Sequence, residues 1–444
     1  MNSITTMVPH ACFFIDSPLK ARLEGFELLL YSSETPEQRR LAEEDLERLW
    51  KDDDFEDVFI LPCLSVRTGL DLFLSIRHFP PGSEFILSGI NIPTITKIIE
   101  HHGLKVRSCD INLETMGPSI EIMASLVSNR TVAVLVAHLY GKRFDMQPVI
   151  DLCKRYSIPV LEDCAEAFSG LGYKGHPESD ISLFSFGTIK FSTAYGGAIM
   201  RIKNKKWYDD MKSLYSTYPV QSKFEYGKKL AKYFVISPLL NNTFLFRTGI
   251  SAFKMVGVDH KEVFTPFIRS FRINLITSIR YQPSVILLNN LTLRLSAFDE
   301  AEHKIVKEKG DYVAHRLPYE AVAVGQKACD VNYWLFPILV EKQKEVTKML
   351  NDLGVDSTIG STQLAVVVDS CDTHDSGTCC ESCRGEHVPN AKFLMDHVVY
   401  LPVHKLVPYH ELDKIVNAVH KSVKHFGCQR LTLPSSSKFC NNML

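Results

Sequence analysis

The chain has 444 residues, enough to bury a sizeable core and to form more than one domain. Its 50 basic and 51 acidic residues nearly cancel, so overall charge favours neither nucleic acid nor an anionic membrane as a partner. The N-terminus lacks the pattern of a secretory signal, and no apolar run is long enough to span a bilayer. Most of the 12 cysteines are dispersed singly, as in reduced intracellular proteins. We therefore expect a cytoplasmic protein.

The first predicted element is a helix over residues 35–51, which begins at a Thr-Pro pair and carries apolar residues at helical spacing. Strand-like and helix-like segments then alternate. Strands are expected at 85–87, 106–109, 132–137, 159–161 and 182–186, with helices at 94–102, 120–128 and 147–156. This alternation predicts an α/β fold whose mostly parallel sheet is covered by helices on both faces. Ligands of such sheets bind beyond the carboxyl ends of the strands.

The later part of the chain is expected to form a smaller α+β domain. Its elements are a long helix at 283–316, a strand at 333–340 and helices at 343–353 and 409–424. We predict four segments: 1–54 as an N-terminal helical segment, 55–260 as the large α/β domain, 261–427 as the small domain and 428–444 as a mobile tail.

Two candidate functional residues each stand at the end of a run that begins like a strand. Asp163 ends the run 158–163, and Lys190 ends the run 182–190. An amine that forms a Schiff base with pyridoxal phosphate (PLP) and a carboxylate that keeps its ring nitrogen protonated are the two groups such an enzyme needs. Ser185 lies in the same apolar run as Lys190, where its hydroxyl can reach the cofactor phosphate. Each residue alone is ordinary at a strand end, but together they predict a large PLP-binding domain.

The chain resembles the DegT/DnrJ/StrS-type sugar aminotransferases, a family of fold type I PLP enzymes, from about residue 61 to 199 and more weakly to about 423. The resemblance rests on blocks in the family's order and spacing: VLVAHLYG at 134–141, VLEDCAEA at 160–167, FSFGTIK at 184–190, the pair Gly196–Gly197 and YLPVH at 400–404.

The resemblance implies that Lys190 forms the internal aldimine and shuttles a proton, that Asp163 pairs with the pyridinium nitrogen and that Ser185 binds the phosphate. Some relatives carry His in place of this lysine and dehydrate sugars, so Lys190 favours transamination. The resemblance also implies a homodimer with sites at the subunit interface. A nucleotide-linked keto-sugar becomes the leading acceptor.

The phosphate-binding turn and the ring-stacking position depart from the usual family pattern. The turn aligns with SVRTG at 65–69, where the helix-start amides, that of Val66 included, and the side chain of Arg67 are candidates for the phosphate. The aligned stacking position holds Ile92, which keeps apolar contact with the cofactor but loses aromatic stacking.

Two charged residues complete the predicted cofactor-binding set. Glu166 stands where the family usually has Gln, which adds a negative charge beside the cofactor or substrate. Arg280 lies in a segment that aligns with a family segment that reaches the cofactor of a neighbouring subunit. An ordinary surface arginine is an equally good interpretation of this residue.

Residues 170–175 match the dinucleotide-binding pattern G-x-G-x-x-G, but turn-forming residues follow them. Because that fingerprint needs a strand directly before it and a helix after it, we favour a tight hairpin. The cysteine-rich segment 371–387 offers thiolate and imidazole ligands, but only Cys380 and Cys383 have the customary zinc spacing. We favour an oxidisable loop there and predict no metal.

The apolar segment 230–253 is interrupted by Pro238 and Arg247. We favour a helical pair packed on the core or on a dimer partner over a lid or a membrane-surface patch. For the whole chain we predict a PLP-dependent aminotransferase that uses a small-molecule amino donor and a keto acceptor, without nucleic acid. Another PLP chemistry on the same fold, such as a lyase or decarboxylase, and a non-catalytic scaffold stay open.

Overall fold

A central sheet of seven strands organises the computed structural model, which describes residues 8–51, 58–255, 274–360, 362–370 and 387–434. The strands, in sheet order, are β1 (Phe59–Cys63), β9 (Ala198–Ile202), β8 (Ile181–Ser185), β7 (Val160–Asp163), β5 (Thr131–Ala137), β2 (Glu84–Ser88) and β4 (Lys105–Cys109). Neighbours from β8 to β4 are parallel, whereas β9 is antiparallel to both β8 and β1. The predicted α/β class with a mostly parallel sheet is confirmed.

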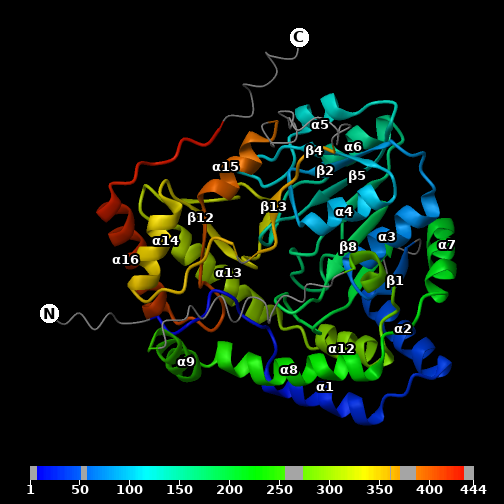
Figure 1. Ribbon diagram of the computed structural model, residues 1–444, viewed down its shortest axis with the longest axis horizontal. Coiled ribbons are helices and arrows are strands. Elements are labelled where there is room, and N and C mark those ends of the chain that lie inside the picture. Colours follow the sequence, from blue (N-terminus) through cyan, green and yellow to red (C-terminus); the bar gives the residue numbers. More distant parts are fainter. Residues whose placement is uncertain (1–7, 52–57, 256–273, 361, 371–386, 435–444) are drawn as a thin grey trace.

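Helices cover both faces of this sheet (Figure 1). They are α3 (Val66–Arg77), α4 (Pro93–His101) and α7 (Lys205–Ser216) on one face and α5 (Ile120–Leu126) and α6 (Gln147–Arg155) on the other. In β5, Val134 packs in the α5–α6 core while Leu135 packs in the α3–α4 core. The central strands read as continuous apolar runs because both of their faces are buried.

The later part of the chain contains a three-stranded antiparallel sheet formed by β10 (Val322–Ala323), β12 (Phe336–Leu339) and β14 (Val398–Leu401). It packs with α13 (Glu300–Ala314), α14 (Gln343–Asp352) and α16 (Tyr409–Phe426), while α15 (Pro389–His397) precedes β14. The long helix predicted at 283–316 is wrong. It is interrupted between α12 (Val285–Ser296) and α13, because the carboxylate of Asp299 accepts hydrogen bonds from Ala301 N and Glu302 N and starts a new helix.

Two short ladders join the two sheets. β6 (Lys142–Arg143) pairs with β11 (Asp330–Val331), and β3 (Ile90–Asn91) pairs with β13 (Ala365–Val366). Each ladder therefore bonds a backbone segment of the large sheet region to one from the later part of the chain. The predicted domain boundaries stay a prediction.

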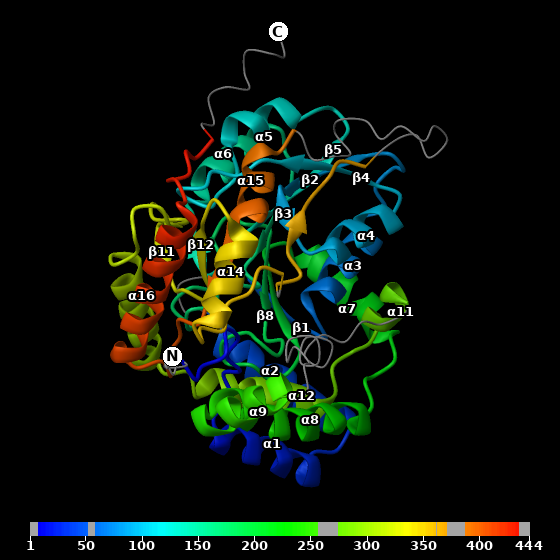
Figure 2. The same cartoon turned by 60° about the vertical axis from the view of Figure 1, so that its left-hand side comes forward.

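A layer of helices closes one end of the molecule (Figure 2). It comprises α1 (Leu19–Tyr31), α2 (Pro36–Trp50), α8 (Lys223–Asn241), α9 (Thr243–Met255) and α12. The favoured helical pair at 230–253 is present as α8 and α9, whereas α1 was not predicted. None of the helices in the described ranges is long and apolar enough to cross a bilayer.

Two further expectations concern irregular segments. Residues 170–175 form turns with no helix after them, so the dinucleotide pattern is rejected as expected. The favoured tight hairpin is wrong, because the flanking strands β7 and β8 run parallel. The cysteines at 371–383 and the end of the tail, 435–444, lie outside the described residues.

Candidate active site

Lys190 lies in a turn just beyond the end of β8. Its backbone N–H donates to Gly187 O at 3.0 Å, and the hydroxyl of Thr193 donates to the same carbonyl at 2.7 Å. The Lys190 side chain is only 16% exposed. The turn therefore places a largely buried amine, which proteins rarely keep without a partner, at the carboxyl edge of the sheet.

Asp163 is the last residue of β7, the strand next to β8. Its side chain is buried, and its Oδ1 accepts the Ala165 N–H at 3.0 Å. Burial raises the pKa of Asp163 to about 6, although the Ala165 N–H and the charge of Lys190 oppose this rise. A cationic partner would therefore stabilise the ionised carboxylate further.

Glu166 lies closest to the Lys190 amine among the acidic residues. Its Oε1 is 3.4 Å from Lys190 Nζ, and its Oε2 accepts the Tyr140 N–H at 2.9 Å. Burial raises the pKa of Glu166 and lowers the pKa of Lys190, while the attraction between the two groups opposes both shifts. The site thus holds an amine in contact with the Glu166 carboxylate and under the electrostatic influence of the buried Asp163.

Trp334 is a site residue that sequence reasoning missed. The Lys190 Nζ lies 3.6 Å from the centre of the Trp334 ring, within the range of a cation–π contact. The indole N–H donates to Ile189 O at 2.7 Å, which fixes the ring against the turn that carries the lysine. The only sequence signal was an aromatic residue in the strand predicted at 333–340.

The predicted phosphate-binding residues gather at the same edge of the sheet. Ser185 is the last residue of β8, and α3 begins with Val66 and Arg67 just after β1. Because β1 and β8 are both antiparallel to β9, their carboxyl ends lie at one edge. The Ser65 hydroxyl accepts the Thr68 N–H at 3.2 Å and caps α3, so the N-terminal end of this helix lies at the same edge.

Ile92 also lies at this edge, as the residue that precedes α4 after β2 and β3. Arg280 has a different position. Its guanidinium forms a bidentate salt bridge with the buried Asp71 of α3, with distances of 2.9 and 3.0 Å. His102 and Arg280 together hold the pKa of Asp71 below its ordinary value despite burial. A contact of Arg280 with a neighbouring subunit's cofactor stays a prediction.

Behind Asp163, the preceding residue Glu162 forms a buried hydrogen-bonded hub. Its carboxylate accepts bonds from four side chains and one backbone N–H, contributed by His138, Tyr173, Ser179, Ser182 and the amide of His176. The structure brings the ligand atoms of His138, Glu162 and Cys164 close enough together to hold a metal ion. Within the described ranges, no other cluster of His, Cys, Asp or Glu side chains has this spacing. Burial raises the pKa of the Cys164 thiol well above its ordinary value, and the Glu162 lone pairs are already used. The hub therefore suits a structural role that fixes the end of β7.

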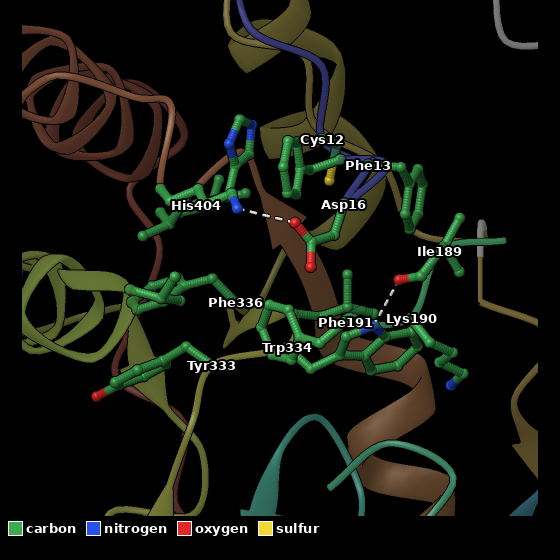
Figure 3. A pocket seen from close by; sticks show the side chains of 16 residues that line it. Cys12, Phe13, Asp16, Ile189, Lys190, Phe191, Tyr333, Trp334, Phe336 and His404 are labelled. Atoms are coloured by element: carbon green, nitrogen blue, oxygen red, sulfur yellow. Dashed lines mark hydrogen bonds and ion pairs between the residues drawn. The ribbon is translucent and has the colours of Figure 1, made fainter. Parts of the chain in front are cut away.

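A small pocket lies behind the Lys190 turn, next to Asp16 and Phe191 (Figure 3). Figure 3 shows the Lys190 side chain extending away from Asp16, so its amine leaves the pocket. The cavity volume is about 20 Å³, which is room for one or two water molecules.

Comparisons with known proteins show a family resemblance over part of the chain and a fold shared over nearly all of it. The sequence model of the DegT/DnrJ/EryC1/StrS aminotransferase family matches residues 59–228. A UDP-4-amino-4-deoxy-L-arabinose–oxoglutarate aminotransferase from Shewanella sediminis is 32% identical over 136 residues, which are 30% of this chain and 35% of the relative. A GDP-perosamine synthase from Escherichia coli is 35% identical over 148 residues, 32% of this chain and 39% of the relative. The chain thus matches little more than a third of the length of these curated relatives.

Solved structures extend the similarity of fold to nearly the whole chain. A sugar aminotransferase from Micromonospora echinospora has a TM-score of 0.63 and 16% identity, covering 94% of this chain and 100% of that one. An E. coli GDP-4-keto-6-deoxy-D-mannose-3-dehydratase with bound hydrated PLP has a TM-score of 0.63 and 13% identity, covering 92% of this chain and 100% of that one. The predicted fold is confirmed, and so is the predicted resemblance: over residues 59–228 the chain is similar to the DegT/DnrJ/EryC1/StrS aminotransferase family.

Proposed function

We propose that this protein is a PLP-dependent aminotransferase that transfers an amino group from a small-molecule donor to a keto acceptor. The observation that carries the proposal is the buried amine of Lys190, 3.4 Å from the Glu166 carboxylate and electrostatically coupled to Asp163 at the end of the adjacent strand. The names of the matched relatives support a nucleotide-linked sugar as the acceptor. A homodimer in the cytoplasm is part of the same proposal.

The residues present fit PLP. Lys190 would hold the cofactor covalently, and Asp163 would face its ring nitrogen, where a protonated ring stabilises the buried carboxylate. Ser185 and the helix start at Val66 and Arg67 offer hydroxyl, amide and guanidinium donors for a phosphate at the same edge of the sheet. When bound, PLP supplies an electron sink for charge that develops on the substrate carbon.

The chain's own contribution is to hold and move protons at a largely buried site. Lys190 Nζ is the group that can carry a proton to and from the substrate carbon, because it is a primary amine with a lowered pKa. Glu166 and Trp334 contact this amine from two directions and restrict where it can point. Ile92 offers apolar contact in place of an aromatic ring.

A lysine at position 190 also bears on the alternatives. The dehydratase of similar fold shows that this architecture serves more than one reaction. Lys190 supplies the amine on which transamination depends. A PLP-dependent lyase or decarboxylase would use the same lysine, so only the reaction products distinguish these activities from transamination. A non-catalytic scaffold has no need to bury an amine beside a carboxylate.

The decisive experiment compares the absorption spectra of the wild type and Lys190→Ala after reconstitution with PLP. We expect the band of lysine-bound PLP in the wild type and its loss in Lys190→Ala. The exposed Lys154→Ala variant is the control and should keep the band. A wild type that shows no such band would reject the PLP enzyme. Wild type that binds PLP but forms no amine product from any keto-sugar tested would favour the other PLP chemistries.

A further inference from the structure

Large apolar side chains are exposed along three helices that lie together at one end of the molecule (Figure 1). α1, α8 and α9 carry more of them than any other part of the described chain. They are Leu19, Leu23, Leu30, Tyr31, Phe224, Val235, Phe244, Leu245 and Met255, with exposures from 38% for Leu245 to 84% for Met255. An exposed apolar concentration of this kind marks an interaction surface.

Helix α8 presents two distinct faces. Its buried face is formed by residues at helical spacing, namely Tyr226, Leu230, Tyr233, Ser237 and Leu240. Its outward face follows the same spacing with Phe224, Lys228, Ala231 and Val235, all of them exposed. Since the inner face already packs in the core, the outward apolar residues are not needed for folding of this helix.

Helix α1 lies beside α8 and runs antiparallel to it. Leu29 packs at Gly227 and Gly25 packs at Leu230, with 3.2 Å between the Leu methyl carbon and the glycine Cβ position in both cases. Further along, the rings of Phe26 and Phe234 meet edge to face, with 5.1 Å between their centroids. The exposed leucines of α1 thus lie on a helix that packs directly against α8. We name the six residues Leu19, Leu23, Leu30, Phe224, Val235 and Phe244 the α1–α8–α9 surface.

The charges around this surface have one dominant sign. Residues 222–255 contain six cations and a single anion, Glu225, whereas the charges of α1 balance, with Lys20 and Arg22 against Glu24 and Glu27. The excess of positive charge therefore comes from the α8–α9 segment, although the chain as a whole has a net charge of -1. The ammonium of Lys228 lies 4.4 Å from the centre of the exposed Phe224 ring. Positive charge and apolar contact area therefore occur on the same outward face.

This combination identifies the partner by its chemistry. A second copy of the chain would bring two like-charged surfaces together, which opposes association. An anionic lipid bilayer offers both an apolar boundary and negative headgroups. The α8 helix ends at Asn241, where Asn242 accepts the N–H groups of Phe244 and Leu245 and starts α9. The helices α8 and α9, with 19 and 13 residues, can lie flat on a bilayer surface. None of the described helices is long and apolar enough to cross a bilayer.

We propose that the α1–α8–α9 surface binds peripherally to a membrane that contains anionic lipids. Phe224, Val235 and Phe244 enter the boundary between headgroups and acyl chains, while Lys228 and Arg247 contact lipid phosphates. The proposal stands independently of the enzymatic activity.

Flotation with phosphatidylcholine vesicles, with and without phosphatidylglycerol, tests the proposal on the full-length protein. We expect the wild type to float with vesicles that contain phosphatidylglycerol and to remain below those that lack it. The double variant Phe224→Ser/Phe244→Ser, in which each replaced ring is 70% exposed, should lose at least tenfold in partitioning. The control is Tyr319→Ser, a 72% exposed aromatic residue elsewhere, which should bind as the wild type does.

A second pair of variants tests the charges. Lys228→Gln and Arg247→Gln should each weaken binding to phosphatidylglycerol vesicles about fivefold, the effect of one lost surface cation. The proposal is overturned if the wild type stays in solution with anionic vesicles or floats equally with both kinds. A wild type that does not float, together with a fall in oligomeric mass in Phe224→Ser/Phe244→Ser, would assign the surface to a second copy of the chain.

Discussion

The amine of Lys190 lies 3.6 Å from the centre of the Trp334 ring, although Lys190 follows β8 of the large sheet and Trp334 precedes β12 of the small one. The indole N–H holds the same turn through Ile189 O at 2.7 Å. On its other side the amine faces Glu166. Glu166 and the Trp334 ring both favour the protonated amine, whereas burial lowers the pKa of Lys190 and favours the neutral, nucleophilic form.

Glu166→Gln should allow PLP to attach at lower pH. The Glu166 carboxylate raises the pKa of Lys190 and opposes the lowering caused by burial. Without this charge the pKa of Lys190 falls further, so the neutral amine that forms the covalent bond is present at lower pH. The measurement is the absorbance of bound PLP against pH. Glu178→Gln, a surface carboxylate paired with Lys154, is the control, and an unchanged or higher midpoint in Glu166→Gln would contradict the role of Glu166.

Trp334 variants should separate the aromatic contact from packing. Trp334→Phe keeps a ring over the amine, whereas Trp334→Leu removes a cation–π contact of about 1 to 2 kcal/mol. We therefore expect the pH midpoint of PLP attachment to fall in Trp334→Leu by about one unit and to change little in Trp334→Phe. The same spectroscopic titration measures both. Equal shifts in the two variants would show that Trp334 acts through packing alone.

Asp163→Asn should stabilise the cofactor-free protein at neutral pH. Burial raises the pKa of Asp163 from 3.8 to about 6, so the native state binds this proton more tightly than the unfolded chain. The contribution of the Asp163 proton to the free energy of unfolding is fully present below pH 3.8 and is lost as the pH rises through about 6. Asparagine removes the cost of ionisation, roughly 2 to 3 kcal/mol. Urea unfolding across this pH range should show the gain only at the higher pH, while PLP-dependent activity is lost.

Glu162→Leu should have the opposite effect on stability. His138, Tyr173 and a backbone N–H from His176 hold the pKa of the Glu162 carboxyl well below its ordinary value despite burial. The ionised Glu162 carboxylate therefore contributes to the free energy of unfolding at pH values above its ordinary pKa. This contribution is lost as the pH falls through the lower pKa of the folded protein. Leucine leaves these donors unpaired, and we expect a loss of about 3 to 5 kcal/mol in the free energy of unfolding at neutral pH. Urea unfolding with a loss below 1 kcal/mol would contradict the importance of this hub.

The sheet could be predicted because its central strands are short apolar runs separated by helical patterns, and Asp163 and Lys190 each follow such a run. The contacts of Lys190 could not be predicted in full. Trp334 is 144 positions away in the chain, and only the packing of two sheets brings its ring to the amine. The break before α13 was missed because the apolar pattern continues on both sides of Asp299, whose local capping bonds override it.

The two short ladders between the sheets limit how the protein can move. Asn332 N donates to Gly141 O at 2.8 Å next to the β6–β11 pair, and Arg143 is salt-bridged to Asp330 across it. The β3–β13 pair lies directly before Ile92 in the chain. A hinge-like opening of the two halves would have to break main-chain hydrogen bonds at both places. The two halves are therefore held at a nearly fixed separation, and whatever binds at the carboxyl edge of the sheet must fit the protein as it stands rather than draw the halves together.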